Sequence, residues 1–207
     1  MGVPIAVARL YGIGDMAAGP RAPATTHESA IVLIPPQDVW EPIQAIRRVH
    51  DRQVSRWMPH VTLLYPFLPR DALAGALPAA ERALSSVAPF AVRLATFAVF
   101  RHRGGTFTLW LAPEPKDALA AVQAALVERF PECDATGRFA GGFTPHLSVG
   151  QARGEAELEA LRREVDGWRP LAFTARAVSV IVRERPPRDV FRTLADMPLG
   201  GIDREHD

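Results

Sequence analysis

The sequence predicts an α+β fold, in which two antiparallel sheets flank a central cleft and helices lie outside. Three observations support this prediction. Short apolar runs alternate with amphipathic segments of helical period. Turn signals at Arg103-Gly104-Gly105 and at Pro186-Pro187 each separate two strand-like segments. The order strand, helix, hairpin occurs twice, at about 60–111 and 146–194, which predicts two pseudo-symmetric lobes.

The N-terminal part predicts an arm, a strand and a helix. Residues 1–28 are rich in Gly, Ala and Pro and predict a flexible N-terminal arm, in which residues 3–10 are apolar enough for an edge strand. Residues 29–34 form an apolar run that predicts a buried strand. Asp38 is the expected N-cap of a helix that extends to about Asp51. Its apolar positions recur at helical spacing: Val39, Ile43, Ile46 and Val49.

The middle of the chain contains the first strand–helix–hairpin unit. Residues 60–64 predict a strand, and the Ala- and Leu-rich residues 71–87 predict a helix that breaks near Pro78. The hairpin strands and the next helix follow at 90–100, 106–111 and 116–130. These segments place a hairpin directly after the first unit's helix, so we expect it to complete the same lobe.

The second unit follows a Gly-rich loop at 131–144. It begins with a predicted strand at 145–149 and a helix at 155–165. Its hairpin strands are expected at 173–182 and 190–194, and residues 198–207 are expected to form a polar C-terminal tail. The folded domain is therefore expected to cover residues 29–197.

The composition restricts the classes of partner. The chain has 207 residues, 48% of them hydrophobic, and a net charge of +1, which argues against a broad grip on duplex DNA because that needs a basic face. No apolar run approaches the roughly 18 residues of a membrane span, and residues 1–10 lack a signal-peptide pattern. The single Cys133 cannot form an internal disulfide, which predicts a cytoplasmic setting. The oligomeric state is not indicated.

Two short segments repeat each other, Pro59-His60-Val61-Thr62-Leu63 and Pro145-His146-Leu147-Ser148-Val149. Each reads Pro, His, aliphatic, hydroxyl, aliphatic. In an extended strand alternate side chains share a face, so each copy is expected to present an imidazole beside a hydroxyl and to bury the aliphatic residues. Two such strands facing each other would form a small polar cleft suited to a phosphodiester.

The residue types in this cleft indicate acid–base chemistry. A histidine pair can hold one neutral and one protonated ring near pH 7, so one ring can activate water and the other can protonate a leaving oxygen. The hydroxyls of Thr62 and Ser148 can hold the non-bridging phosphate oxygens. No third metal ligand stands at a recognisable spacing, and no phosphate loop for ATP is present. We therefore expect chemistry that needs no metal or other cofactor.

The paired His-x-Thr/Ser-x segments resemble the signature of the two-histidine (2H) phosphoesterase superfamily, which includes 2′-5′ RNA ligase-like proteins and RNA 2′,3′-cyclic phosphodiesterases. The contexts Met58–Phe67 and Phe143–Gln151 are also similar, and the resemblance covers roughly residues 29–197. It implies the bilobal fold of that superfamily and hydrolysis of 2′,3′-cyclic phosphates of RNA 3′ ends or small nucleotides to 2′-phosphates. It further implies His146 as base and His60 as acid, with 2′-5′ ligation as a possible reverse reaction. Most relatives carry Thr where this chain has Ser148, which keeps the donor.

Other side chains near the motifs are candidate substrate contacts. Tyr65, Phe67 and Phe143 could offer a ring to a stacked base, or could simply pack in the core. Arg153 follows the second motif and could hold phosphate. Three other functions remain open: a non-catalytic module that binds RNA ends, a 3′-exonuclease that leaves a cyclic phosphate, and a structural domain with coincidental motifs.

Overall fold

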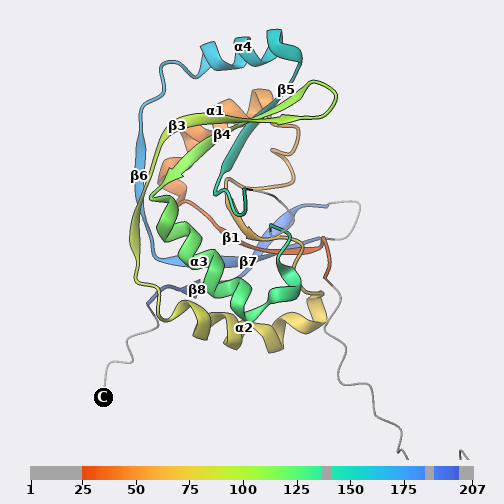
Figure 1. Ribbon diagram of the computed structural model, residues 1–207, viewed down its shortest axis with the longest axis vertical. Helices are drawn as coiled ribbons and strands as arrows, with labels where there is room; N and C mark the ends of the chain where they lie inside the picture. The colour runs from red at the N-terminus through yellow and green to blue at the C-terminus, as the bar shows by residue number, and fades with distance from the viewer. Residues whose placement is uncertain (1–24, 137–140, 185–188, 201–207) are drawn as a thin grey trace, which may run out of the picture.

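The computed structural model describes residues 25–136, 141–184 and 189–200, and these form two four-stranded antiparallel sheets (Figure 1). The first sheet has the order β2-β1-β7-β8, with β1 (Ser29–Leu33), β2 (Val61–Leu64), β7 (Ala177–Arg183) and β8 (Phe191–Pro198). The second has the order β5-β4-β3-β6, with β3 (Phe90–His102), β4 (Thr106–Glu114), β5 (Leu147–Arg153) and β6 (Leu171–Ala175). The α+β class predicted from the sequence is confirmed.

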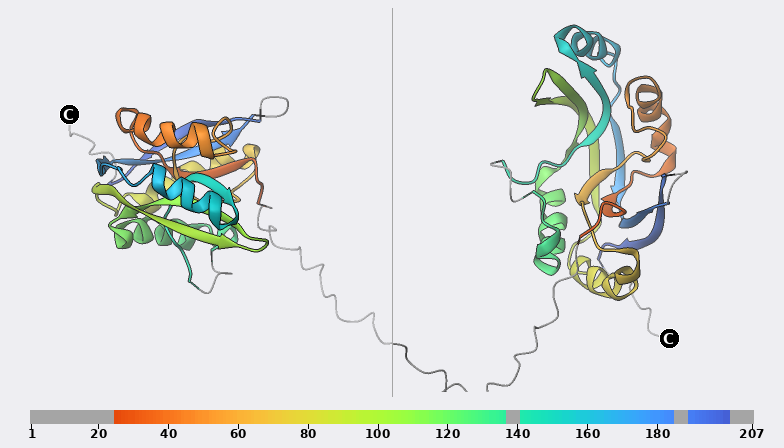
Figure 2. Two further views of the ribbon diagram at one scale, coloured as in Figure 1. Left: turned by 90° about the horizontal axis from the view of Figure 1, so that it is seen from above. Right: turned by 90° about the vertical axis from the view of Figure 1, so that its right-hand side faces the viewer.

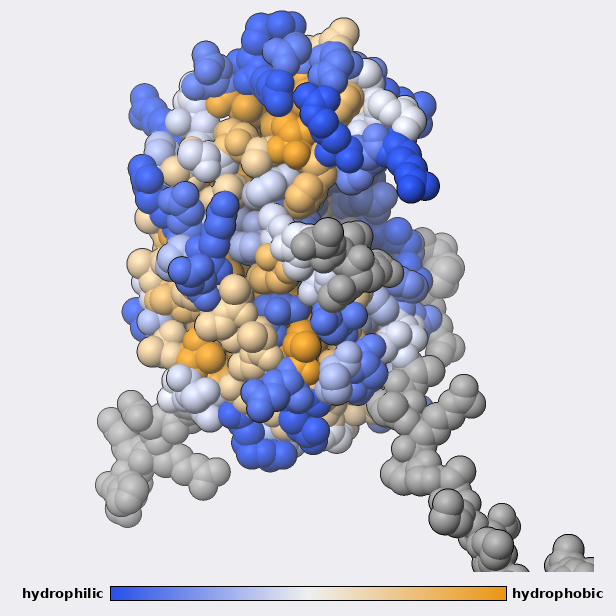
Figure 3. Space-filling model, viewed as in Figure 1, coloured by the Kyte–Doolittle hydropathy of each residue, from blue (hydrophilic) through white to orange (hydrophobic). Residues whose placement is uncertain are grey.

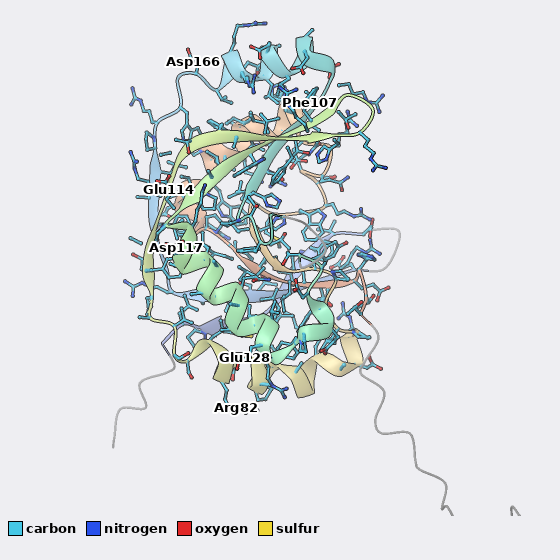
Figure 4. All side chains as sticks on the ribbon, viewed as in Figure 1. Arg82, Phe107, Glu114, Asp117, Glu128 and Asp166 are labelled. Atoms are coloured by element: carbon cyan, nitrogen blue, oxygen red, sulfur yellow. The ribbon has the colours of Figure 1, made fainter. Side chains whose placement is uncertain are left out.

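The helices gather at two ends of the molecule (Figure 2). In the described part of the chain they are α1 (Trp40–His50), α2 (Arg70–Leu84), α3 (Lys116–Arg129) and α4 (Gly154–Glu164), with 3-10 turns at Gln37–Val39 and Pro131–Cys133. Helices α1 and α4 both pack on β5, whereas α2 packs on α3 and β8. Arg82 of α2 and Glu128 of α3 mark one end, and Asp166, just after α4, marks the other (Figure 4). Hydrophilic residues gather at both ends (Figure 3). None of the described helices is long and apolar enough to cross a membrane.

Each sheet takes its hairpin from the other half of the chain. The hairpin β3–β4 follows the first motif in sequence, but β4 pairs with β5, the strand of the second motif. The hairpin β7–β8 follows the second motif, and β7 pairs with β1 beside the first motif strand β2. The sheets therefore do not correspond to the segments 60–111 and 146–194, although both segments contain a strand, a helix and a hairpin in that order.

The segment expected as one strand at 173–182 is two strands in different sheets. Strand β6 pairs with β3, and β7 pairs with β1 and β8. The chain changes sheet at Arg176, whose carbonyl accepts a hydrogen bond from the backbone N–H of Leu199 at 2.8 Å. Ala175 and Val178, on either side of the crossing, are both buried. The apolar pattern therefore continues through the change of sheet and does not reveal it.

Helix α1 differs from its prediction at both ends. Asp38 lies in the preceding 3-10 turn, and the N-cap position is taken by Val39 without a side-chain cap. Val49 is 72% exposed, because the buried face follows Ile43 and Arg47. Arg47 is charged yet buried, since its guanidinium pairs with Asp51 four residues later at 2.8 Å. An ion pair at i, i+4 thus occupies the face where the sequence suggested a valine.

Helix α2 is continuous through Pro78, where the sequence predicted a break. A proline removes one backbone hydrogen bond from a helix, here the bond to the carbonyl of Ala74. The buried residues of α2 lie on both sides of the proline and hold the helix against its neighbours: Leu73, Ala76, Ala79, Ala80 and Leu84. The packing of these side chains therefore outweighs the hydrogen bond that α2 loses at Pro78.

The folded part extends beyond 29–197 at both ends. Thr26 pairs with Phe67 through two backbone hydrogen bonds of 2.6 and 3.1 Å, so residues 25–28 do not belong to a free arm. Leu199 is buried, and the backbone N–H of Gly200 donates to the carbonyl of Leu84 at 3.3 Å. The possible strand at 3–10 and the remainder of the tail lie outside the described residues.

Helix α1 crosses β5 so closely that position 150 has no room for a side chain. A Cβ on Gly150 would lie 2.7 Å from the Cβ of His50 and 3.2 Å from a methyl of Leu161. Gly150→Ala is therefore expected to lower the free energy of unfolding by about 1–3 kcal/mol, as overpacking does, in urea denaturation. Gly75→Ala is the matched control, because a Cβ there meets open space in the middle of α2 and should stabilise by about 0.5–1 kcal/mol. A Gly150→Ala protein as stable as the wild type would contradict this close packing.

Candidate active site

The two motif histidines lie immediately before the edge strands of the two sheets. Among the described strands, β2 follows His60 and pairs only with β1, and β5 follows His146 and pairs only with β4. Strands β2 and β5 contact each other, so the two sheets meet where the motifs lie. The fold therefore brings together two segments that are far apart in the sequence.

Both motifs alternate as the sequence predicts. The aliphatic residues are buried, each at most 1% exposed: Val61, Leu63, Leu147 and Val149. The polar residues between them are half-buried: His60, Thr62, His146 and Ser148. The buried side chains fix each strand, and the half-buried ones remain available to a ligand.

The two imidazoles are held by equivalent hydrogen bonds. Nδ1 of His60 lies 2.7 Å from the carbonyl oxygen of Met58, and Nδ1 of His146 lies 2.8 Å from that of Thr144. A carbonyl can only accept, so Nδ1 carries the hydrogen in both rings. In the neutral form this leaves the lone pair on Nε2. In each neutral ring Nε2 is therefore the nitrogen that can accept a proton or a hydrogen bond.

Burial lowers the pKa of both histidines, that of His60 to about 4. For His60 the hydrogen bond to Met58 and the charge of Asp51 oppose this shift, while the charges of Arg47 and His146 add to it. The charge of His146 acts on His60 in the same direction as that of Arg47, but more weakly than burial does. Burial thus favours the neutral form of both rings in the free protein, whereas the sequence suggested one neutral and one protonated ring near pH 7.

A cavity of about 530 Å³ opens at His146. Its wall includes four side chains that the sequence suggested: Thr62, Tyr65, Phe143 and His146. The rest comes mainly from the end of β3 (Phe100, Arg101 and His102) and from the segment after α3 (Cys133, Ala135 and Thr136). His60 and Ser148 are not part of this wall, although each lies two residues from a residue that is. The cavity therefore brings one hydroxyl and one imidazole together from different motifs.

His60 is covered by an aromatic stack that the sequence did not predict. Its ring lies 4.8 Å from that of Trp57 at an interplanar angle of 19°. Trp57 in turn stacks on Phe191, with ring centroids 3.8 Å apart. Trp57 could have been suspected, since it stands three residues before His60. Phe191 comes from β8 at the other end of the chain, and nothing local in the sequence pointed to it.

His146 meets two aromatic rings edge to face. Phe100 lies 4.9 Å away at 87°, and Trp110 lies 5.9 Å away at 68°. Trp110 stands opposite Ser148 in the β4–β5 pair. The two histidines therefore have similar hydrogen bonds but different aromatic surroundings.

Two predicted substrate contacts lie elsewhere. Phe67 is 1% exposed and packs edge to face against Phe130, so it is a core residue. Arg153 ends β5 seven residues after His146, and a strand advances about 3.3 Å per residue, which places it roughly 20 Å away. Its backbone N–H donates to Glu157 at 2.7 Å beside the start of α4. Because β5 is extended, a residue at its far end lies distant from the motif that precedes the strand.

A buried polar cluster links α1 to both motif regions. Besides its pair with Asp51, Arg47 donates to the carbonyl of Trp57 at 2.8 Å. Asp51 accepts a hydrogen bond of 3.0 Å from the amide of Gln151 on β5. The cluster fixes the segment that leads into His60 against the strand that follows His146. Within the described ranges, no group of three His, Cys, Asp or Glu side chains could hold a metal ion.

Solved structures share this fold. TT0787 of Thermus thermophilus has 21% sequence identity and a TM-score of 0.57, and the match covers 86% of this chain and 100% of that one. E. coli LigT complexed with 3′-AMP has 14% identity and a TM-score of 0.55, covering 85% and 99%. A phosphoesterase has 15% identity and a TM-score of 0.56, covering 84% and 98%. At these identities the likeness shows the fold alone. No curated protein matches the sequence significantly.

The family model of the 2′-5′ RNA ligase superfamily matches residues 35–187. This segment contains both motifs, begins just before the 3-10 turn at Gln37–Val39 and extends a few residues past β7. The match confirms the resemblance to two-histidine phosphoesterases on which the sequence interpretation depended. The chain belongs to the 2′-5′ RNA ligase superfamily.

Proposed function

We propose that this protein is a metal-independent phosphodiesterase that hydrolyses 2′,3′-cyclic phosphates of RNA 3′ ends or small nucleotides to 2′-phosphates. The observation that carries the proposal is the matched pair of imidazoles at the meeting edges of the two sheets. Each is tied through Nδ1 to a carbonyl two residues earlier, which leaves Nε2 for the chemistry. Membership of the superfamily supports the reaction class.

In the proposed reaction His146 is the base and His60 is the acid. The phosphodiester carries a negative charge, which favours the protonated form of a ring beside it, so His60 gains its proton as substrate binds. His146 Nε2 takes a proton from water, and the water oxygen bonds to phosphorus. The bond from phosphorus to the ribose 3′ oxygen breaks, and His60 Nε2–H protonates that oxygen. Thr62 and Ser148 donate hydrogen bonds to the non-bridging oxygens. The product is a 2′-phosphate.

The cavity at His146 is the proposed site for the nucleoside. Its volume of about 530 Å³ lies within the range of roughly 300–1,000 Å³ that is usual for small-molecule sites. The rings of Tyr65, Phe100 and Phe143 lie in its wall and offer faces or edges to a base. E. coli LigT, which shares the fold, has been crystallised with 3′-AMP, which supports a nucleotide ligand.

Hydrolysis of 2′,3′-cyclic AMP tests the proposal. We expect 2′-AMP as the product, identified by chromatography against 2′-AMP and 3′-AMP standards, at a rate that EDTA does not change. The rings and hydroxyls already supply an acid, a base and donors for the phosphate, so no metal is required. Formation of 3′-AMP would reverse the orientation given to the substrate. Activity that is lost with EDTA and restored by zinc or manganese would contradict metal independence.

RNA substrates separate the alternative functions. An RNA with a 2′,3′-cyclic end should be hydrolysed to a 2′-phosphate, and the same site could join such an end to a 5′-hydroxyl in reverse. Stepwise shortening of an RNA with release of cyclic nucleotides would favour the 3′-exonuclease. Binding of the cyclic end without turnover would favour a module that captures RNA ends, and neither binding nor turnover would favour a structural domain.

A further inference from the structure

The two motif histidines differ in how aromatic rings contact them. The face of His60 lies nearly parallel to the indole of Trp57, whereas His146 meets Phe100 and Trp110 at angles of 87° and 68°. A cation held over the face of an indole is attracted by the electron density of the ring. A protonated His60 therefore gains an attraction from its stack that the edge-to-face rings around His146 do not offer in the same way.

The indole of Trp57 is itself held on several sides. Its other face stacks on Phe191 at 3.8 Å and 26°, and Tyr65 contacts it at 5.4 Å and 83°. The Trp57 carbonyl accepts a hydrogen bond from Arg47, which is buried and paired with Asp51. The stack is therefore anchored both through its rings and through its backbone.

We propose that Trp57 is a positioning residue for His60, whose indole holds the imidazole in one orientation and stabilises its protonated form. The inference rests on the proposed function, since it gives the first motif the role of acid. The hydrogen bond to Met58 fixes one edge of the imidazole, and the indole covers one face. These two independent contacts together set the direction in which Nε2 points. The paired motifs alone supply only the first of these contacts.

The charged groups that act on His60 are few. Arg47 and Asp51, at the end of α1, act on it in opposite directions and neutralise each other as a buried pair, and His146 precedes β5. Trp57 adds no charge, but its ring covers His60, and burial is the main reason that the pKa of His60 is lowered. A smaller side chain at position 57 would reduce that burial and raise the pKa, so a fall of the pKa in the variant can be assigned to loss of the indole face.

The pH dependence of kcat tests the stabilisation of the protonated ring. An acid must carry its proton, so activity falls as pH rises through the pKa of His60 in the complex. Trp57→Leu should lower that pKa, so the high-pH limb of the kcat profile should move to lower pH by about 0.5–1 unit. A shift of this size corresponds to about 0.7–1.4 kcal/mol less stabilisation of the protonated ring. The replacement should also reduce kcat by about 10- to 100-fold with little change in KM. Trp57→Phe keeps an aromatic face and should shift the limb less.

Two further variants make this result specific. Trp168→Leu removes a different indole, which packs on Phe97 and donates a hydrogen bond to the carbonyl of Leu94. The high-pH limb of the kcat profile of this variant should stay at the wild-type pH. If Trp57→Leu fails to fold, Phe191→Leu keeps the indole but removes the ring behind it, and should move the limb in the same direction by less. If Trp57→Leu folds and its high-pH limb stays at the wild-type pH, the indole does not stabilise protonated His60.

A nitrogen NMR measurement on ¹⁵N-histidine-labelled protein reads the orientation without turnover. The wild type and Trp57→Phe should show neutral His60 with its hydrogen on Nδ1 only, whereas Trp57→Leu should show a mixture of the two tautomers. A single tautomer in the Leu variant contradicts the positioning role. If the wild type does not hydrolyse a cyclic nucleotide, the proposed function fails, while this measurement still decides whether Trp57 holds His60.

Discussion

Replacement of either His60 or His146 by Ala is expected to reduce kcat for a 2′,3′-cyclic nucleotide by about 10²- to 10⁴-fold or more, the contribution typical of a general acid or base. Each ring offers only Nε2, because Nδ1 is bound to a backbone carbonyl. No other nitrogen of the same motif can replace it. The measurement is steady-state hydrolysis of 2′,3′-cyclic AMP by each purified variant.

The double variant and the pH profile test whether the rings act together. His60→Ala with His146→Ala should be much less impaired than the product of the two single losses, because both rings serve one step. The wild-type profile should be bell-shaped. Its low-pH limb reports the base, which must lose its proton; burial, which lowers the pKa of His146, moves that limb towards lower pH, and the bound phosphate opposes this shift. Each single variant should lose one limb.

His50→Ala is the matched control for the histidine variants. His50 ends α1, and its ring lies 2.6 Å from Glu164 on α4 rather than at the cavity. Alanine keeps the Cβ that faces Gly150, so the packing of α1 on β5 is preserved. Its activity should equal that of the wild type. Full activity in His60→Ala or His146→Ala would remove that residue from the mechanism.

Loss of a motif hydroxyl is the second large effect. Thr62→Val and Ser148→Ala should each reduce kcat by about 10- to 1,000-fold, the upper end being the worth of one oxyanion donor. The larger loss is expected at Thr62, because it lines the cavity with His146 and Ser148 does not. Both replacements preserve the strand, so thermal unfolding should change little while turnover falls.

Variants that keep the hydroxyl separate hydrogen bonding from shape. Thr62→Ser and Ser148→Thr retain the donor and should stay within a few-fold of the wild type. If Thr62→Ser loses activity while Thr62→Val keeps it, the methyl group rather than the hydroxyl matters at that position. Equal activity of Thr62→Val and wild type would exclude the hydroxyl from phosphate binding.

The elements that could be predicted depend mostly on residues that are neighbours in the sequence. The predictions that were wrong concern contacts between segments far apart in the chain. The alternation at Val61–Leu64 and the turn at Gly104-Gly105, where both glycines have positive φ, are set by neighbouring residues and could be predicted from the chain. The partner of each hairpin depends on residues far away in the sequence. Neither hairpin signal contains information about whether β4 pairs with β2 or with β5.

The same limit applies to the site. His60, Thr62, His146 and Ser148 follow from a two-residue period that any strand imposes. Phe67 also stands near the first motif, but its neighbour Phe130 comes from the end of α3, and that contact places it in the core. Of the three aromatic residues suggested by proximity in sequence, Tyr65 and Phe143 do line the cavity, whereas Phe67 belongs to the core.

The exchange of hairpins has a consequence for the order in which the protein is made. A growing chain can pair β1 with β2 and β3 with β4 as soon as they emerge, but the sheet of the first motif lacks β7 and β8 until residue 198 has been synthesised. The strands β7 and β8, which complete the sheet of His60, thus emerge after every strand of the other sheet. Because such distant pairings form late and slowly, a nascent or truncated copy carries the first histidine without a finished site. Only a chain synthesised through β8 can hold both histidines in place.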